Sequence, residues 1–169
     1  MHLRELREED ALPMLSWMHD SEVVRYMQAD FQSKTLHDCE EFIRNSKSDE
    51  RSLHLAVADE NDEYMGTVSL KGIDPESRSA EFAITMRKEA MGKGFAAFGM
   101  DAILRLALEE KHLDMVYWYV RSVNERAVRF YDKHGYPRKD AAPAFVPQKL
   151  AERPGLIWYA VTKEDLNER

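Results

Sequence analysis

The middle of the chain places apolar residues at every second position, which is typical of strands. From Ser52 onward Leu53, Leu55 and Val57 alternate with less apolar neighbours, and we interpret this as a half-buried strand. Clusters of Asn, Asp, Pro and Ser then mark two turns, at 61–62 and 74–77. The pattern predicts an antiparallel meander of three strands, at 53–57, 64–71 and 79–86.

Helical patterns precede this meander. A short strand at 3–6 leads into three acidic residues, which favour a helix start, and a helix is expected over 11–19. Asp20 and Ser21 can cap a second short helix that runs through 23–27. Thr35 and Asp38 resemble a capping box at the start of a third helix.

The C-terminal half alternates helices and strands. A largely apolar helix is expected at 94–111, a strand at 115–120, a helix at 124–134 that Gly135 ends, and a strand at 156–162. Four of the six prolines fall within 137–155, which is interpreted as a long loop. The whole chain therefore predicts an α/β fold, and its 169 residues predict a single domain over 1–169.

Composition places the chain among ordinary globular proteins, with 44% hydrophobic and 33% charged residues. The longest apolar runs, at 115–120 and 156–161, are far shorter than the roughly 20 residues that a membrane-spanning helix needs. The charged N-terminus does not resemble a secretory signal, and the lone Cys39 fits a reducing compartment. A cytoplasmic protein is expected.

The net charge of −7 argues against a nucleic acid or an anionic membrane as partner. A cationic substrate suits this balance better, although the acidic excess also fits a role in solubility alone. The same two interpretations apply to a group of carboxylates in the N-terminal helices, which either attract a cationic acceptor or form a solvated surface. These are Asp20, Glu22, Asp30, Asp38, Glu40 and Glu41.

One glycine-containing segment, Met91 to Ala97, lies between an expected strand and the helix that follows it. Glycines let the backbone approach a ligand, and the free N–H groups of a helix start favour a phosphate group. The alternative is a glycine turn that only reverses the chain. A nucleoside-triphosphate loop is excluded because no Gly-Lys-Ser/Thr occurs, and the third glycine of a dinucleotide fingerprint is replaced by Ala97.

A second motif, Asn-x-x-Ala-x-x-x-Tyr-x-x-x-Gly-Tyr, runs from Asn124 to Tyr136. Helical spacing places Asn124 and Tyr131 on one side of the helix, and asparagine is a favoured N-cap residue. Alone, the two residues would be interpreted as a helix cap and a core tyrosine.

Together the two motifs, at their separation of some thirty residues, resemble the acyl-coenzyme A-binding core of the GNAT superfamily of N-acetyltransferases over about 53–136. The resemblance implies a single-domain GNAT-like fold with a mixed, mostly antiparallel sheet of six to seven strands flanked by helices. The stretch at 17–23 resembles more loosely the branch with ribosomal-protein N-terminal, spermidine and sugar-nucleotide acetyltransferases. That branch implies a primary amine as the acceptor.

The resemblance also implies how acetyl-coenzyme A (acetyl-CoA) is held. Backbone N–H groups would cradle the pyrophosphate, and the pantetheine arm would run along a strand edge. The residues implied for the cradle region are Met91, Gly92, Lys93, Gly94, Phe95, Ala96, Ala97 and Asn124. Those implied for the strand edge are Ile84, Thr85 and Met86. Met91 stands where the family has Gln or Arg, which puts the strength of binding in doubt. Lys93 would supply a nearby positive charge.

Two residues are predicted to act in catalysis. An alkylammonium with a pKa near 10.4 must lose a proton before it attacks a thioester. Glu81 matches the strand position of a family carboxylate that takes this proton, usually through water, while Tyr119 stands where some relatives have a glutamate. For Glu81 the alternatives are a solvated strand residue and water as the base. Tyr131 is the candidate that protonates the leaving thiolate.

The expected function is therefore direct transfer of an acetyl group from acetyl-CoA to a primary amine in a ternary complex, with a protein N-terminus as one acceptor. The alternatives are a small amine (a polyamine, amino sugar or aminoglycoside) and a non-catalytic CoA-binding sensor. The six histidines show no paired metal-ligand spacing, so no metal is expected, and Cys39 is interpreted as a packing residue. A monomer or a homodimer is expected.

Overall fold

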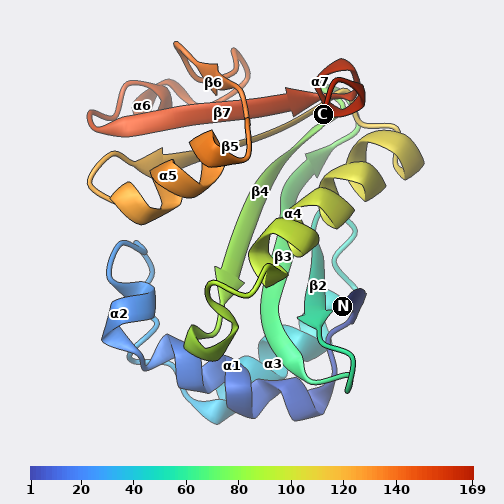
Figure 1. Cartoon of the computed structure of the whole chain (residues 1–169), viewed down its shortest axis with the longest axis vertical. Coiled ribbons are helices and arrows are strands. Elements are labelled where there is room, and N and C mark those ends of the chain that lie inside the picture. Colours follow the sequence, from blue (N-terminus) through green and yellow to red (C-terminus); the bar gives the residue numbers. More distant parts are fainter. The chain divides into compact units, whose positions relative to one another are not determined.

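The computed structural model describes all 169 residues and contains a seven-stranded sheet (Figure 1). Its strand order is β1-β2-β3-β4-β5-β7-β6. β4 pairs with β5 in parallel, whereas β1–β2, β2–β3, β5–β7 and β6–β7 are antiparallel. The predicted fold class is confirmed. The strands are β1 (His2–Glu5), β2 (Leu53–Ala58), β3 (Tyr64–Asp74), β4 (Ser79–Met86), β5 (Met115–Arg121), β6 (Arg138–Lys139) and β7 (Leu156–Thr162).

Seven α-helices connect and flank these strands, together with short 3-10 turns at Glu8–Asp10 and Lys88–Ala90. The helices are α1 (Ala11–Met18), α2 (Ser21–Val24), α3 (Leu36–Ser46), α4 (Phe95–Arg105), α5 (Glu125–Lys133), α6 (Gln148–Ala151) and α7 (Lys163–Asn167). Each predicted helix and strand is present, and most ends differ from the prediction by one to three residues.

The chain divides into two compact units. The first contains residues 1–71 and 83–103, and the second contains residues 72–82 and 104–169. Strand β4 contributes its first half to the second unit and its second half to the first. That the whole chain is a single domain over 1–169 stays a prediction.

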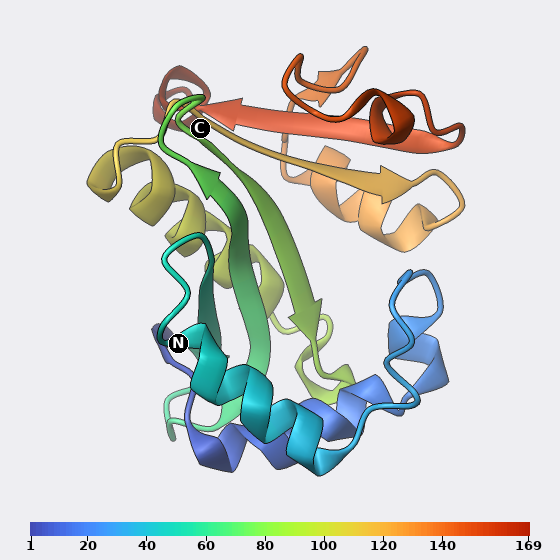
Figure 2. The same ribbon diagram turned by 180° about the vertical axis from the view of Figure 1, so that it is seen from behind.

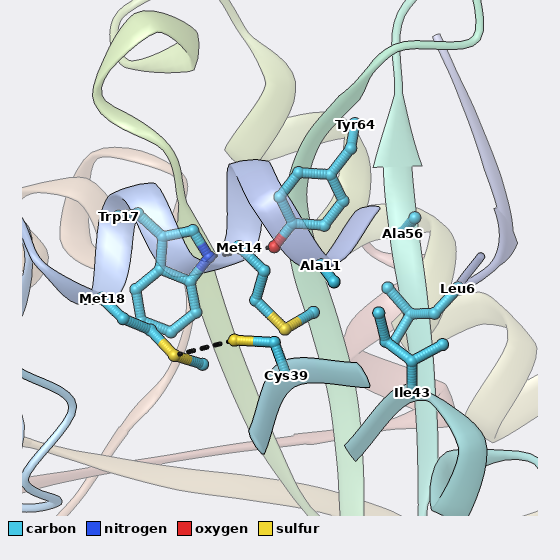
Figure 3. Close-up of a cluster of buried hydrophobic side chains, with 9 residues drawn as sticks. All are labelled: Leu6, Ala11, Met14, Trp17, Met18, Cys39, Ile43, Ala56 and Tyr64. Carbon is cyan, nitrogen blue, oxygen red and sulfur yellow. Dashed lines mark hydrogen bonds between the residues drawn. The ribbon is translucent and has the colours of Figure 1, made fainter. Parts of the chain in front are cut away.

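In the first unit, α1 and α3 pack on β2 and β3 through a cluster of buried side chains (Figure 3). Trp17 donates its indole N–H to the Tyr64 hydroxyl at 3.0 Å, which keeps two buried polar groups paired. The Cys39 thiol lies 3.6 Å from the Met18 sulfur, and burial raises its pKa. Cys39 is thus a core residue, as expected from the sequence.

Strand β2 is more buried than its alternating pattern predicts. From Leu55 to Ala58 every residue is buried, so the prediction of a half-buried strand was wrong. Ala56 faces the α1 and α3 cluster, whereas on the other side Val57 meets α4 at Gly99, where a Cβ would lie only 2.6 Å from Val57. Because the residues at these contacts are small, the sequence pattern does not reveal that both faces of the strand are buried.

In the second unit, β5 and β7 have different neighbours on their two faces. Helix α5 lies on one face, and the segment that carries α6 lies on the other (Figures 1 and 2). Trp118 is the register partner of Tyr159, and their rings stack 5.5 Å apart on the α5 side. This face is closed, because both rings are almost fully buried.

Three other expectations about the elements need correction. The helix predicted over 94–111 is α4 only to Arg105, after which Leu106–Glu110 form a π-helical turn. The loop predicted at 137–155 contains β6 and α6, because β7 supplies a pairing partner that local sequence does not reveal. Helix α7 was missed, although Thr162 and Asp165 form a capping box.

A charged network fixes β1 to the turn between β2 and β3. Asp62 accepts hydrogen bonds from Arg4 at 2.9 Å and from Arg7, and its carboxylate lies 2.9 Å from His2 Nε2. Arg4 also donates to Asp10 at 2.7 Å. The hydrogen bond from Arg7, followed by those from His2 and Arg4, lowers the pKa of Asp62 to about 2.

This network predicts a specific loss of stability in acid. Because the folded pKa of Asp62 lies below its ordinary value of about 3.9, the ionised carboxylate stabilises the fold fully above that value and ceases to do so as the pH falls towards 2. Asp62→Asn is the suitable variant, since asparagine tolerates the left-handed backbone at φ 63°. In urea unfolding, the variant should be less stable than wild type at pH 7, and the difference should vanish near pH 2. A difference that is constant with pH would contradict this role.

Candidate functional site

The segment between β4 and α4 forms a cradle of backbone N–H groups. Gly92 and Gly94 adopt positive φ angles of 75° and 86°, which aim successive N–H groups towards one side, and α4 begins at Phe95. The N–H groups from Gly92 to Ala97 make no well-formed hydrogen bond to a backbone carbonyl within the chain. Such a cradle is suited to a phosphate or pyrophosphate, and its formation needs glycine rather than charged side chains.

The cradle has open space beside it and one neighbouring cation that makes no ion pair. A Cβ placed on Gly92 would meet nothing within 4 Å. Arg87 is paired with Glu63 at 2.9 Å and Lys88 with Glu22 at 2.7 Å, so these two cations are already neutralised. Lys93 is exposed and makes no ion pair within the chain, and it is therefore the charge available beside the cradle.

The last part of β4 has a single strand neighbour. Its parallel pairing with β5 covers Ser79 to Glu81 and ends there, although β4 continues to Met86. Ile84 and Thr85 are partly exposed. This half of β4 offers backbone groups to a ligand in extended conformation, as the sequence resemblance implies for Ile84, Thr85 and Met86.

Glu81 lies on the partly exposed face of β4. Its neighbours Ala80 and Phe82 point to the opposite face and are almost fully buried. Glu81 is the register partner of Tyr117, and its negative charge, added to the effect of burial, raises the pKa of the Tyr117 and Tyr119 phenols. A carboxylate at this position can accept a proton or hold a cation.

Asn124 caps helix α5. Its side-chain oxygen accepts a hydrogen bond from the N–H of Ala127 at 3.2 Å, which satisfies one of the donors at the helix start. The side-chain amide N–H groups remain available for another acceptor. The structure therefore shows the capping role, while contact with a cofactor stays a prediction.

Tyr131 is held in a group of aromatic rings on the closed face of β5 and β7. Its ring lies 5.4 Å from Trp118 and 5.1 Å from Tyr159, between centroids, and the side chain is only 8% exposed. Burial raises the pKa of its hydroxyl above the ordinary value of 10. The hydroxyl makes no hydrogen bond within the chain. The group is a neutral donor with its proton available.

Trp118 is a supporting residue that sequence reasoning missed. It contacts both Tyr131 and Tyr136, and its indole nitrogen is buried without a hydrogen-bond partner. The available signal was the run from Met115 to Val120, where alternation predicts that Trp118 faces opposite to Tyr117 and Tyr119.

The candidate residues fall into both compact units. The cradle and the segment from Ile84 to Met86 belong to the first unit, whereas Glu81, Asn124 and Tyr131 belong to the second. A cavity of about 350 Å³ in the second unit, next to Arg78 and Lys163, contains none of them. No cluster of three or more metal-ligating side chains is present, and no helix is long and apolar enough to cross a membrane.

Four of the six acidic residues of the N-terminal helices have structural partners. Asp20 caps α2, Asp38 is part of the capping box of α3, Glu22 pairs with Lys88, and Asp30 accepts an N–H from the turn after it. These contacts favour the interpretation of an ordinary helix surface over that of a cluster dedicated to a cationic acceptor.

Comparison with known proteins gives one family match and a set of related structures. Residues 1–137 match the acetyltransferase (GNAT) domain. A spermidine N(1)-acetyltransferase from Vibrio cholerae is 29% identical over 103 residues, which are 61% of this chain and 60% of that protein, so the match spans about three fifths of the relative's length.

The fold also matches solved structures over nearly the whole chain. The spermidine N-acetyltransferase of Vibrio cholerae in complex with CoA and spermine has a TM-score of 0.81 at 21% identity, covering 98% of this chain and 97% of that one. A chimera of the Vibrio cholerae enzyme SpeG with hSSAT has a TM-score of 0.79 at 23% identity and covers 99% and 98%. At these identities the likeness concerns the fold.

Proposed function

Because the chain belongs to the GNAT acetyltransferase family, we propose that it transfers the acetyl group of acetyl-CoA to a primary amine of a polyamine. The predicted family is confirmed, and with it, at the level of the family, the expected enzyme class and cosubstrate. The observation that carries the proposal is the cradle of N–H groups from Gly92 to Ala97, which offers a pyrophosphate its donors inside the matched segment.

The acceptor is inferred from similarity and charge. The relative with 29% identity is a spermidine acetyltransferase, and this supports the polyamine alternative more than a protein N-terminus. The net charge of −7 favours a polycation by long-range attraction. A polyamine ammonium with a pKa near 10.4 is neutral in roughly four parts in ten thousand at pH 7, so the enzyme must favour its deprotonated form.

Acetyl-CoA would bind through both parts of the first unit described above. The N–H groups from Gly92 to Ala97 would hold the pyrophosphate, with Lys93 beside them, and the edge of β4 from Ile84 to Met86 would pair with the pantetheine amides. Met91 contributes no charge, but backbone donors are unaffected by that substitution. Asn124 would use its amide N–H groups, since its oxygen caps α5.

The cradle predicts the outcome of replacing a glycine. Gly92→Val forces a β-branched residue into the left-handed region, which costs about 1–2 kcal/mol, and should weaken acetyl-CoA binding by roughly 5- to 30-fold in calorimetry. Gly72→Val is the matched control, because Gly72 also has a positive φ and open space around it but lies outside the cradle. Equal affinities for the two variants would refute this placement of the cofactor.

Glu81 would serve the proton transfer from the acceptor, and Tyr131 would stabilise the leaving group. Glu81 would take the proton of the attacking ammonium, directly or through water. Tyr131 would donate a hydrogen bond to the departing thiolate, whose conjugate acid has a pKa near 8.5. Since burial raises the pKa of Tyr131, the hydroxyl stabilises the thiolate mainly by donation and stays protonated across the neutral range.

The role of Tyr131 predicts a selective effect on rate. Tyr131→Phe preserves the ring and its packing and removes only the hydroxyl group that donates the proton, so the single-turnover rate should fall by about 10²–10⁴-fold while acetyl-CoA affinity stays within about twofold. Rapid-quench measurement of the acetylated amine decides this. An unchanged single-turnover rate would exclude Tyr131 from the chemistry.

The proposed acceptor is tested directly by an amine panel. We expect CoA thiol release with spermidine and spermine to exceed release with a peptide N-terminus or an amino sugar, and mass spectrometry should find one acetyl group on the polyamine. Preference for the peptide would refute the polyamine assignment. Tight CoA binding without transfer to any amine would instead identify a sensor.

A further inference from the structure

Four aromatic side chains form a continuous strip on the face of β5 and β7 opposite to Tyr131; this aromatic strip consists of Tyr117, Tyr119, Phe145 and Trp158. Tyr119 and Trp158 are register partners, with ring centroids 4.9 Å apart. The ring centroids of Tyr117 and Trp158 lie 6.5 Å apart, with an angle of 29° between the ring planes. The contacts link all four rings without using any residue of the closed face.

Three of the four rings of the aromatic strip reach solvent, whereas Trp158 is buried at 5% exposed. Phe145 is 45% exposed, and Tyr117, whose ring centroid lies 5.4 Å from that of Phe145, is partly exposed, as is Tyr119. On the opposite face Trp118 and Tyr159 are at most 2% exposed. Phe145, which contacts Tyr117, belongs to the segment that carries α6, and this segment lies on the face of β5 and β7 away from α5 (Figures 1 and 2). Neighbouring partly exposed rings of this kind mark a recognition surface.

A negative charge borders the aromatic strip. Glu81 is the register partner of Tyr117 on the same face, and its charge influences both tyrosines, whose raised pKa values keep them neutral. The positive charge of Arg153 opposes this effect, because it lowers the pKa of the Tyr119 phenol. Neutral phenol rings beside a carboxylate present negative potential from two sources.

We propose that the aromatic strip binds the part of the acceptor that carries an ammonium group and is not acetylated, while Glu81 at its border serves the reacting nitrogen. This rests on the proposed function and deepens it, since it assigns the residues that distinguish a polyamine from a monoamine. Ring faces attract an alkylammonium by cation–π interaction, and their edges pack on its methylene groups. A polyamine keeps such a charged group after its reacting nitrogen has lost a proton.

The test uses binding rather than turnover, so that it is independent of catalysis. Calorimetry with the CoA-saturated protein compares diaminobutane, which retains a second ammonium, with butylamine, which does not. Tyr117→Leu and Tyr119→Leu should weaken diaminobutane binding by roughly 2- to 30-fold and change butylamine binding by less than about twofold. Arg153→Gln should strengthen diaminobutane binding by about two- to fivefold, because it removes a competing cation.

Conservative variants separate recognition from packing. Tyr117→Phe and Tyr119→Phe keep the ring faces and should retain the preference for diaminobutane. Phe145→Leu provides a third measurement at an exposed position where the core is not disturbed, and Phe42→Leu, an exposed ring on α3 in the first unit, is the control outside the aromatic strip. Unchanged CoA affinity in each leucine variant verifies that the fold is intact.

Three results would overturn the proposal. Equal losses for diaminobutane and butylamine would indicate packing alone, and no loss for either amine would show that the acceptor lies elsewhere. Changed self-association with both amine affinities preserved would identify the face as an interface between copies. If diaminobutane binds with the expected variant pattern but no polyamine is acetylated, the recognition surface stands and the proposed function fails.

Discussion

The proposed binding of acetyl-CoA depends on one constraint: backbone N–H groups must find hydrogen-bond acceptors. Between β4 and α4 the chain turns through two left-handed glycines and leaves the N–H groups from Gly92 to Ala97 without a well-formed hydrogen bond to a backbone carbonyl. These donors need an external acceptor, and an anion at a helix start satisfies several of them at once. Because glycine conformation creates the cradle, its N–H donors do not depend on the side chain of Met91.

In the second unit, the two faces of the paired strands β5 and β7 differ in their chemistry. Alternation along β5 sends Trp118 towards Tyr131 and sends Tyr117 and Tyr119 towards Glu81. The first face is closed and keeps a hydroxyl neutral through desolvation, whereas the second is partly open and negative. A single six-residue aromatic and aliphatic run thus supports both a proposed proton donor and a proposed acceptor surface.

The features that depend on interactions between neighbouring residues were predicted correctly from the sequence. The capping box at Thr35 and Asp38, the N-cap at Asn124 and the bounds of β4 and β7 all follow from short-range rules, and the structure confirms them. Burial on both faces of β2, the pairing that creates β6 and the partners of Trp118 depend on distant segments, so no single-sequence pattern contained them. The resemblance to GNAT enzymes supplied the roles of Glu81 and Tyr131, which periodicity alone left as ordinary strand and core residues.

The central claim is that acetyl-CoA and a polyamine react directly while both are bound. Initial-rate kinetics with acetyl-CoA and spermidine varied together test it most directly, with acetylated spermidine measured as the product. The account predicts intersecting reciprocal plots and no acetylated protein in intact-mass spectra when acetyl-CoA is supplied alone. Parallel plots with an acetylated protein intermediate, or the absence of acetylated spermidine at any substrate concentration, would contradict it.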